Sequence, residues 1–167
     1  MIQLYTGEGK GKTTAAMGLA IRAAGRGKKV VIVQFLKGRD TGELHSLALI
    51  PNITIIRNNE AKGFFHTASP EIRLKITEEN NENLKAALAL PYELIVLDEV
   101  CAAYDLEAID RKAVDDLLSS FSPEKELVLT GRNPPKHFCD AADYISEIHG
   151  VKHPFERGIQ AREGIEY

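Results

Sequence analysis

A glycine- and lysine-rich segment near the start of the chain, GEGKGKTT at residues 7–14, connects two segments of different character. Before it, Ile2–Tyr5 is a short apolar run typical of a buried strand. After it, Thr13–Ala24 is rich in alanine and is followed by Gly25, a residue that favours the end of a helix. A glycine-rich turn between a strand and a helix directs backbone N–H groups and the positive end of the helix dipole toward an anion. The segment therefore predicts a phosphate-binding loop.

This loop departs at one position from the common pattern G-x-x-x-x-G-K-[ST]. Counted from Thr6, it matches at Gly11, Lys12 and Thr13, but threonine takes the place of the first glycine. We expect Lys12 to contact phosphate oxygens and act in catalysis, and the Thr13 hydroxyl to face Mg²⁺. The alternatives are an exposed loop without a ligand and, for Lys10, a solvated lysine. The candidate nucleotide-binding residues of the loop are Gly7, Glu8, Gly9, Lys10, Gly11, Lys12, Thr13 and Thr14.

Further apolar runs rich in valine, isoleucine and leucine recur along the chain. They are continuous rather than alternating, which is typical of strands that helices cover on both faces of a parallel sheet. We expect an α/β fold, with a parallel sheet of about six strands and helices on both faces. One domain covers residues 1–167 and ends in an irregular tail from Gly150 to Tyr167. After Ile2–Tyr5, the predicted strands are Val30–Phe35, Ile53–Ile56, Leu94–Leu97, Leu127–Thr130 and Tyr144–Ile148.

Helices are predicted between these strands. Ser69-Pro70-Glu71 has the composition of a helix start, and Pro91 marks the end of the helix that follows. A second helix is indicated by apolar residues at helical spacing. Two segments, Leu36–Leu44 and Glu60–Thr67, are predicted to be loops. The apolar stripe of the second helix consists of Leu106, Ile109, Ala113, Val114, Leu117, Leu118 and Phe121.

Two carboxylates follow a predicted buried strand, at Asp98 and Glu99. Ligands of open α/β sheets bind beyond the carboxyl ends of the strands, so Thr13 and one of these carboxylates are expected to share Mg²⁺ with a triphosphate. A solvated turn is the alternative for the Asp-Glu pair. Arg132 follows another predicted strand at the same edge, where it either contacts an anion or closes a surface ion pair.

The overall charge excludes some partners. The 21 Lys and Arg residues are balanced by 24 Asp and Glu residues, for a net charge of −3. Nucleic-acid-binding domains usually carry a clustered excess of basic residues, so nucleic acid is not an expected partner. No apolar run approaches the roughly 18 residues needed to cross a bilayer, and we expect a cytoplasmic protein without membrane contact.

The pattern as a whole resembles the P-loop corrinoid adenosyltransferases. Members of this family move the 5′-deoxyadenosyl group of ATP to the Co(I) centre of a reduced corrinoid and release tripolyphosphate. The resemblance runs almost end to end, and the phosphate loop together with the tail makes it specific. The matching segments are Gly7–Thr14, Val33–Gly38, Leu97–Glu99, Thr130–Arg132, Lys152–Phe155, Gly158–Arg162 and Gly164–Tyr167.

The resemblance implies a RecA-like P-loop fold, ATP with Mg²⁺, a reduced corrinoid as the second substrate and a homodimer. An electron-donor protein for reduction of Co(II) is compatible with it, but the sequence does not identify the reductant. It also implies that Thr13 and Glu99 serve the metal, and that Phe64 and His66 close over the corrinoid. The alternative for this aromatic loop is a hydrophobic plug on the core. Glu8 stands where the family usually has Asn, and His66 stands where a Trp is familiar.

Two other functions fit the phosphate loop alone. A small-molecule kinase or ATPase on the same fold transfers the γ-phosphoryl group and releases ADP. A non-catalytic ATP-binding regulatory module binds nucleotide and has no affinity for a corrinoid. The products and ligands of the three functions differ, so each has its own test.

Overall fold

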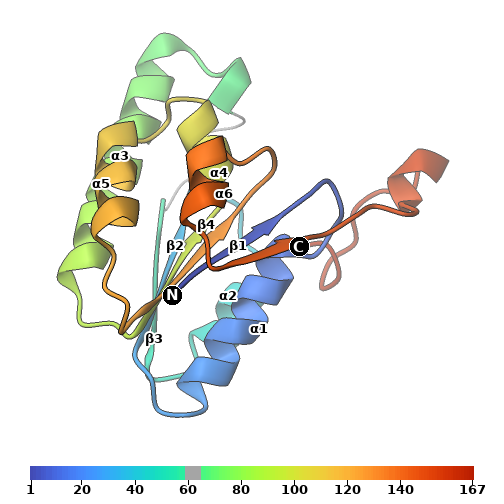
Figure 1. Ribbon diagram of the computed structural model, residues 1–167. Helices are drawn as coiled ribbons and strands as arrows, with labels where there is room; N and C mark the ends of the chain where they lie inside the picture. The colour runs from blue at the N-terminus through green and yellow to red at the C-terminus, as the bar shows by residue number, and fades with distance from the viewer. Residues whose placement is uncertain (59–64) are drawn as a thin grey trace.

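A computed structural model describes residues 1–58 and 65–167 of the chain. Its centre is a six-stranded sheet with the order β3-β2-β4-β5-β1-β6, in which all neighbouring strands are parallel (Figure 1). The predicted α/β class and parallel sheet are confirmed. Strand β5 separates the strand before the glycine-rich loop from the strand that ends at Asp98. The strands are β1 (Ile2–Thr6), β2 (Val30–Gln34), β3 (Ile53–Arg57), β4 (Leu94–Asp98), β5 (Glu126–Thr130) and β6 (Tyr144–Glu147).

Helices cover both faces of the sheet, as predicted (Figure 1). One face packs against α1 (Lys12–Ala24) and α2 (Gly42–Leu47). Within the described ranges, no helix is long and apolar enough to span a membrane. The other face packs against α3 (Pro70–Ala89), α4 (Val100–Asp105), α5 (Arg111–Ser120) and α6 (Lys136–Ala141). The described residues also form two short 3-10 helices, Phe65–Thr67 and Pro154–Arg157.

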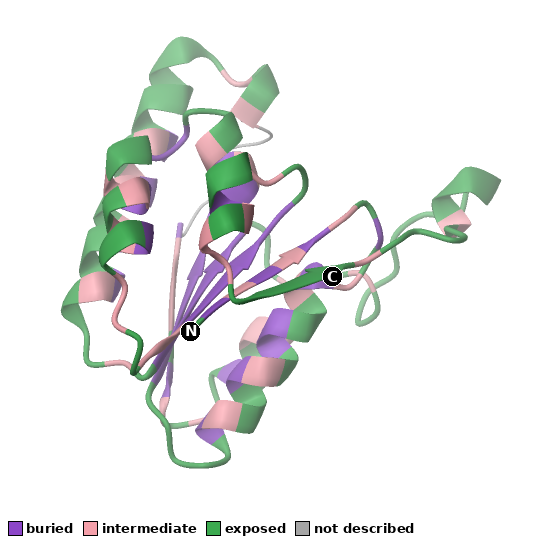
Figure 2. Cartoon of the chain, in the orientation of Figure 1, coloured by how far each residue is buried: buried purple, intermediate pink, exposed green. Residues whose placement is uncertain are grey.

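The continuous apolar runs are explained by burial on both faces. In β2, Val31 and Val33 belong to the core under α3–α6, whereas Val30 and Ile32 belong to the core under α1 and α2. Successive side chains of a strand point to opposite faces, so a strand between two helical layers needs apolar residues at every position. Every residue of β2 and β4 is buried (Figure 2).

The last strand does not follow this rule. All residues of β6 are exposed, with Tyr144 and Ile145 each about half accessible (Figure 2). The prediction that every apolar run is a strand buried on both faces is therefore wrong for β6. Its apolar composition reflects pairing with β1 at the edge of the sheet.

The predicted helices are confirmed with one correction. Ser69 caps α3 by accepting a hydrogen bond from the Ile72 N–H, and α3 ends at Ala89, before Pro91. The stripe from Leu106 to Phe121 is not one helix, because Asp110 caps α5 and its carboxylate accepts the N–H groups of Lys112 and Ala113. A carboxylate that pairs with these N–H groups starts a new helix at that point.

Each of the two predicted loops contains part of a helix. Helix α2 begins inside the predicted loop Leu36–Leu44, which is therefore shorter than expected. Residues 60–64 of the predicted loop Glu60–Thr67, including Phe64, lie outside the described residues. Its last residues, Phe65–Thr67, form one of the 3-10 helices.

A buried asparagine network ties α3 to two neighbouring segments. Asn80 is fully buried, and its amide donates to the Ala108 carbonyl over 2.8 Å. Its amide oxygen accepts from Asn58 over 3.4 Å, and Asn83 donates to the Asn58 oxygen over 2.6 Å. Buried polar groups are stable only when they are paired, so this network holds the exit of β3 and the segment before α5 against α3.

Replacement of Asn80 by alanine is predicted to destabilise the fold. The change leaves the buried Ala108 carbonyl and the Asn58 amide without their partner, which costs about 2–3 kcal/mol of unfolding free energy. Urea denaturation measures this loss. Glu78→Ala on the exposed side of α3 is the matched control and is expected to stay within about 0.5 kcal/mol of the native chain. A loss below about 1 kcal/mol for Asn80→Ala would contradict the prediction.

Candidate active site

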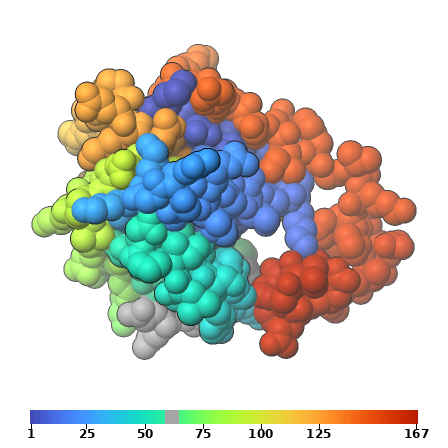
Figure 3. All heavy atoms as spheres, turned by 90° about the horizontal axis from the view of Figure 1, so that it is seen from below, coloured from blue at the N-terminus to red at the C-terminus, as the bar shows by residue number. Residues whose placement is uncertain are grey.

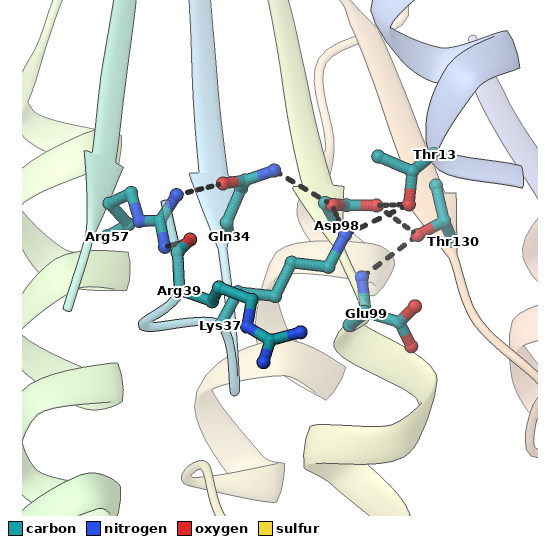
Figure 4. Close-up of polar contacts among 8 residues, drawn as sticks. All are labelled: Thr13, Gln34, Lys37, Arg39, Arg57, Asp98, Glu99 and Thr130. Atoms are coloured by element: carbon teal, nitrogen blue, oxygen red, sulfur yellow. Dashed lines mark hydrogen bonds and ion pairs between the residues drawn. The ribbon is translucent and has the colours of Figure 1, made fainter. Parts of the chain in front are cut away.

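A fully buried carboxylate, that of Asp98 at the end of β4, lies at the centre of the polar contacts at the carboxyl edge of the sheet (Figure 4). Its Oδ1 accepts hydrogen bonds from the hydroxyls of Thr13, over 2.9 Å, and Thr130, over 2.7 Å. Thr13 lies in the first turn of α1, and Thr130 ends β5. Thus three separate elements meet at one oxygen.

The second oxygen of Asp98 has its own donors. Lys37 Nζ lies 2.6 Å from Oδ2 and 3.0 Å from Thr13 Oγ1. The amide of Gln34, at the end of β2, donates to Oδ2 over 3.3 Å. Arg57 NH1 in turn donates to Gln34 Oε1, so the chain of contacts continues to the end of β3 (Figure 4). Burial of an unpaired carboxylate is costly, and these donors provide the compensation.

The glycine-rich loop closes around Lys12. The Lys12 ammonium is almost buried and donates to the carbonyls of Gly7, over 2.6 Å, and Gly9, over 2.9 Å. Burial lowers the pKa of Lys12, and the nearby Arg132 guanidinium lowers it further. Gly11 precedes α1 with φ at 122°. The lysine, the loop and the helix start therefore lie together, and their binding of an anion stays a prediction.

Two glycines of the loop are required by a close approach to the segment after β6. The Gly9 N–H donates to the Ile148 carbonyl over 2.7 Å. A Cβ on Gly9 would lie 2.7 Å from backbone atoms of Ile148 and His149, and one on Gly7 would overlap the Ile148 carbonyl. Any side chain at these positions would push the loop away from β6.

Glu8 and Arg132 form an ion pair with 3.3 Å between Oε2 and Nε. Both side chains are more than half exposed, so the pair contributes little to stability. The pair nevertheless gives the Glu8 carboxylate a cationic partner in Arg132. The contact of Arg132 with a bound anion stays a prediction.

Glu99 follows Asp98 directly but occupies a different position. Its backbone is left-handed, with φ at 62°, and its N–H donates to Thr130 Oγ1 over 2.9 Å. The Glu99 carboxylate points away from the Asp98 contacts (Figure 4). A non-glycine residue in this conformation is strained, so the surrounding contacts must hold it there. Such residues cluster at functional sites.

The donor set fits Mg²⁺. The hydroxyl of Thr13 and the carboxylate of Asp98 are hard oxygen donors 2.9 Å apart, and Mg²⁺ in nucleotide sites is held by one or two such groups together with phosphate oxygens. Among the described residues, no three His, Cys, Asp or Glu side chains form a metal-binding group.

The remaining predicted residues lie around this centre. Thr14 is exposed in the first turn of α1. Phe64 lies outside the described residues, whereas His66 is exposed in the 3-10 helix that precedes α3. The carbonyl of His66 accepts a hydrogen bond from Arg73 NH2 over 2.7 Å. The structure thus places His66 at the start of α3 and leaves its role toward the corrinoid as a prediction.

The tail returns to the phosphate loop. Lys10 Nζ lies 3.0 Å from Glu166 Oε1, and Arg162 contacts the same carboxylate through its side chain and its backbone N–H. Arg39 lies over the Tyr167 ring, 5.4 Å from its centre, so the end of the tail reaches the segment after β2 (Figure 3). Residues from the two ends of the chain therefore border the same site.

Sequence reasoning missed Gln34, Lys37 and Thr130 as members of the site. Gln34 and Lys37 stand in the segment that resembles the adenosyltransferase family, and Thr130 precedes Gly131-Arg132. A polar residue at the end of a buried run is a signal that could have found Gln34 and Thr130, because a buried polar side chain needs a partner.

A parallel sheet, a glycine-rich loop that begins a helix, and a buried carboxylate beside the helix threonine define a P-loop nucleotide-binding protein. The family described as ATP:corrinoid adenosyltransferase BtuR/CobO/CobP matches residues 1–167. The chain belongs to this family and is an ATP:corrinoid adenosyltransferase.

Two individual relatives carry the same description as the family. The corrinoid adenosyltransferase CobA of Salmonella typhimurium strain LT2 is 35% identical over 170 residues, which cover all of this chain and 85% of the relative. The corrinoid adenosyltransferase of Escherichia coli strain K12 is 34% identical with the same coverage. Among solved structures, a KaiC-like protein of Pyrococcus horikoshii is similar with a TM-score of 0.47 and 16% identity, over 90% of this chain and 72% of that one.

The attachment of the tail is predicted to be lost only in strong acid. Hydrogen bonds from Arg162 and Lys10 hold the pKa of Glu166 at about 2, below the ordinary 4.5. Because the pKa is lower in the folded chain, the contact is complete above pH 4.5 and is lost as the pH falls toward 2. A carbon-13 NMR titration of the Glu166 carboxyl measures the midpoint. Arg162→Gln is expected to raise it, and a midpoint near 4.5 in the native chain would contradict the assignment.

Proposed function

We propose that adenosyl transfer takes place at the carboxyl edge of the sheet, where the glycine-rich loop meets Asp98. The observation that carries the proposal is the contact of the Thr13 hydroxyl with the Asp98 carboxylate, beside the almost buried Lys12. In this reaction the electron pair of Co(I) forms a bond to C5′ of ATP, and the C5′–O bond breaks with its electrons going to tripolyphosphate.

The chemistry requires orientation and charge neutralisation from the protein. Co(I) is itself the nucleophile, so no general base is needed. The leaving group is highly charged, and Lys12 with the N–H groups of the loop stabilises it as the bond breaks. In the structure the Lys12 ammonium already faces the inside of the loop through its contacts with Gly7 and Gly9. A triphosphate held by the loop replaces these two carbonyl contacts.

We assign Mg²⁺ to Thr13 and Asp98, with Glu99 as a further acidic group at the same edge. When bound, the ion neutralises phosphate charge. Thr130 and Gln34 orient the Asp98 carboxylate through their hydrogen bonds. We therefore propose Asp98, rather than Glu99, as the carboxylate that shares Mg²⁺ with Thr13, because Asp98 is the carboxylate that contacts Thr13.

The corrinoid is assigned to the side of the site near His66. Phe64 and His66 are proposed to cover the lower face of the corrin and to keep its lower ligand off cobalt, which favours reduction to Co(I). The homodimer belongs to the same proposal and rests on the family resemblance. An electron-donor protein and a cytoplasmic location are also proposed, the latter from the apolar pattern of the sequence.

The product distinguishes adenosyl transfer from phosphoryl transfer. Incubation of the chain with ATP, Mg²⁺ and chemically reduced cobalamin is expected to give the optical spectrum of a light-sensitive Co–C bond and one tripolyphosphate per turnover. Lys12→Ala is expected to lower the turnover about 10²-fold or more, the order seen for a lost electrostatic stabiliser. The exposed Lys85→Ala on α3 is the matched control and keeps the native rate. Release of ADP without a Co–C bond, or a native rate for Lys12→Ala, would overturn this mechanism.

The two carboxylates are predicted to differ in a metal titration. Asp98→Asn removes the negative charge of the carboxylate that contacts Thr13. The Mg²⁺ concentration for half-maximal turnover is therefore expected to rise at least about tenfold. Glu99→Gln raises the requirement less, because its carboxylate points away from that contact (Figure 4). Thermal melting of both variants checks that they fold. An unchanged titration for Asp98→Asn together with a large shift for Glu99→Gln would reverse the assignment.

A further inference from the structure

Lys37 is a cation within contact of the proposed metal ligands. Its Nζ lies 2.6 Å from Asp98 Oδ2 and 3.0 Å from Thr13 Oγ1, the two side chains assigned to Mg²⁺. The Asp98 side chain is inaccessible to solvent, whereas 27% of the Lys37 side chain remains accessible. The ammonium therefore bridges the buried carboxylate and the open side of the site.

The backbone is bent to bring Lys37 to this position. Leu36, between β2 and Lys37, is left-handed with φ at 58°. A leucine rarely adopts this conformation, and its cost must be offset by the contacts it permits. The bend follows Phe35, whose N–H donates to the Asp98 carbonyl over 3.0 Å. Lys37 is thus held at the site by the same segment that pairs β2 with the end of β4.

The other cations near the loop have different partners. Lys10 pairs with Glu166, and Arg132 pairs with Glu8. Lys12 contacts neutral carbonyls inside the loop. Lys37 differs from all of them, because its carboxylate partner is the proposed metal ligand itself.

Lys37 and a divalent cation compete for the same oxygens. Mg²⁺ binds oxygen at about 2.1 Å, so an ion on Thr13 Oγ1 would lie within about 5 Å of the present position of Nζ. Two positive charges at that separation repel each other strongly in a partly buried site. The long stem of lysine allows the ammonium to leave Asp98 while its Cα stays in place. A triphosphate held in the loop would offer the displaced ammonium a new negative partner.

We propose that Lys37 is a phosphate-binding residue that exchanges its partner during the reaction. It neutralises Asp98 before the metal–nucleotide complex binds, and it contacts the phosphate chain once the divalent cation takes its place on Asp98 and Thr13. Lys37 thereby adds a second lysine to the stabilisation of the tripolyphosphate leaving group. The inference rests on the proposed metal site at Thr13 and Asp98.

The exchange is tested by two binding measurements that do not depend on turnover. Calorimetry with tripolyphosphate at saturating Mg²⁺ reports the phosphate contact, because the cation then occupies Asp98 and Thr13, and electron paramagnetic resonance with Mn²⁺ alone reports the metal site. Lys37→Met is expected to weaken tripolyphosphate binding about 10-fold, as for a lost hydrogen bond to a charged group. The same variant is expected to bind Mn²⁺ about fivefold more tightly or better, because a competing positive charge is gone.

Two further variants separate charge from shape and site from surface. Lys37→Arg keeps the positive charge and is expected to keep tripolyphosphate affinity within about threefold of the native chain. Lys85→Met makes the same charge change on the exposed side of α3 and leaves both affinities unchanged.

A measurement on the native chain covers the case in which Lys37→Met does not fold. The carbon-13 Cε signal of Lys37 is expected to shift when tripolyphosphate is added together with Mg²⁺, while that of Lys85 stays in place.

The results separate this inference from the function on which it rests. Native affinities in Lys37→Met, or a Lys37 signal that tripolyphosphate does not move, would overturn the exchange while adenosyl transfer stands. Tighter Mn²⁺ binding with unchanged tripolyphosphate affinity would also overturn it, because Lys37 would then only neutralise Asp98. Failure of the native chain to bind tripolyphosphate with or without Mg²⁺ would overturn the nucleotide site and this inference with it.

Discussion

The buried carboxylate of Asp98 is the group on which the arrangement of the active site depends. Removal of a carboxylate from water costs several kcal/mol even after relaxation, so the fold must supply donors to both of its oxygens. Thr13 and Thr130 provide them on one side, and Gln34 and Lys37 on the other. These donors come from α1, β5, β2 and the segment after β2, so one compensated charge sets the relative positions of four parts of the chain.

Parallel pairing makes this convergence possible. All carboxyl ends of the strands lie at one edge, and the order of the sheet places β4 between β2 and β5. A residue that ends β4 therefore has Gln34 on one side and Thr130 on the other. The phosphate loop reaches the same edge from β1, and its glycines allow it to lie against the segment after β6. Buried apolar strands thus form a rigid base for polar groups that must be positioned accurately.

The chemistry of the family explains why these groups are charge-stabilising rather than proton-transferring. Attack by Co(I) on C5′ needs no base at the nucleophile, and the departing tripolyphosphate concentrates negative charge at the loop. In the proposed mechanism, Lys12 inside the loop and Lys37 at the carboxylate place positive charge where that charge develops. Glu8 adds a negative charge to the loop, and its ion pair with Arg132 offsets it.

Local patterns predicted the class of fold, because continuous apolar runs are typical of strands buried on both faces. They also predicted the glycine-rich turn before Lys12 and Thr13, whose spacing is that of an anion-binding loop. Long helices with clear caps, such as α3, were also predictable. The short helices α2, α4 and α6 were not, because six residues carry too little periodicity to indicate a helix. Only the tertiary structure decided that Asp98, rather than Glu99, contacts Thr13, that β6 is an exposed edge, and that Lys37 and Glu166 reach the site. Each of these depends on contacts between residues far apart in the chain, and such contacts follow from strand order and backbone bends that no local pattern specifies.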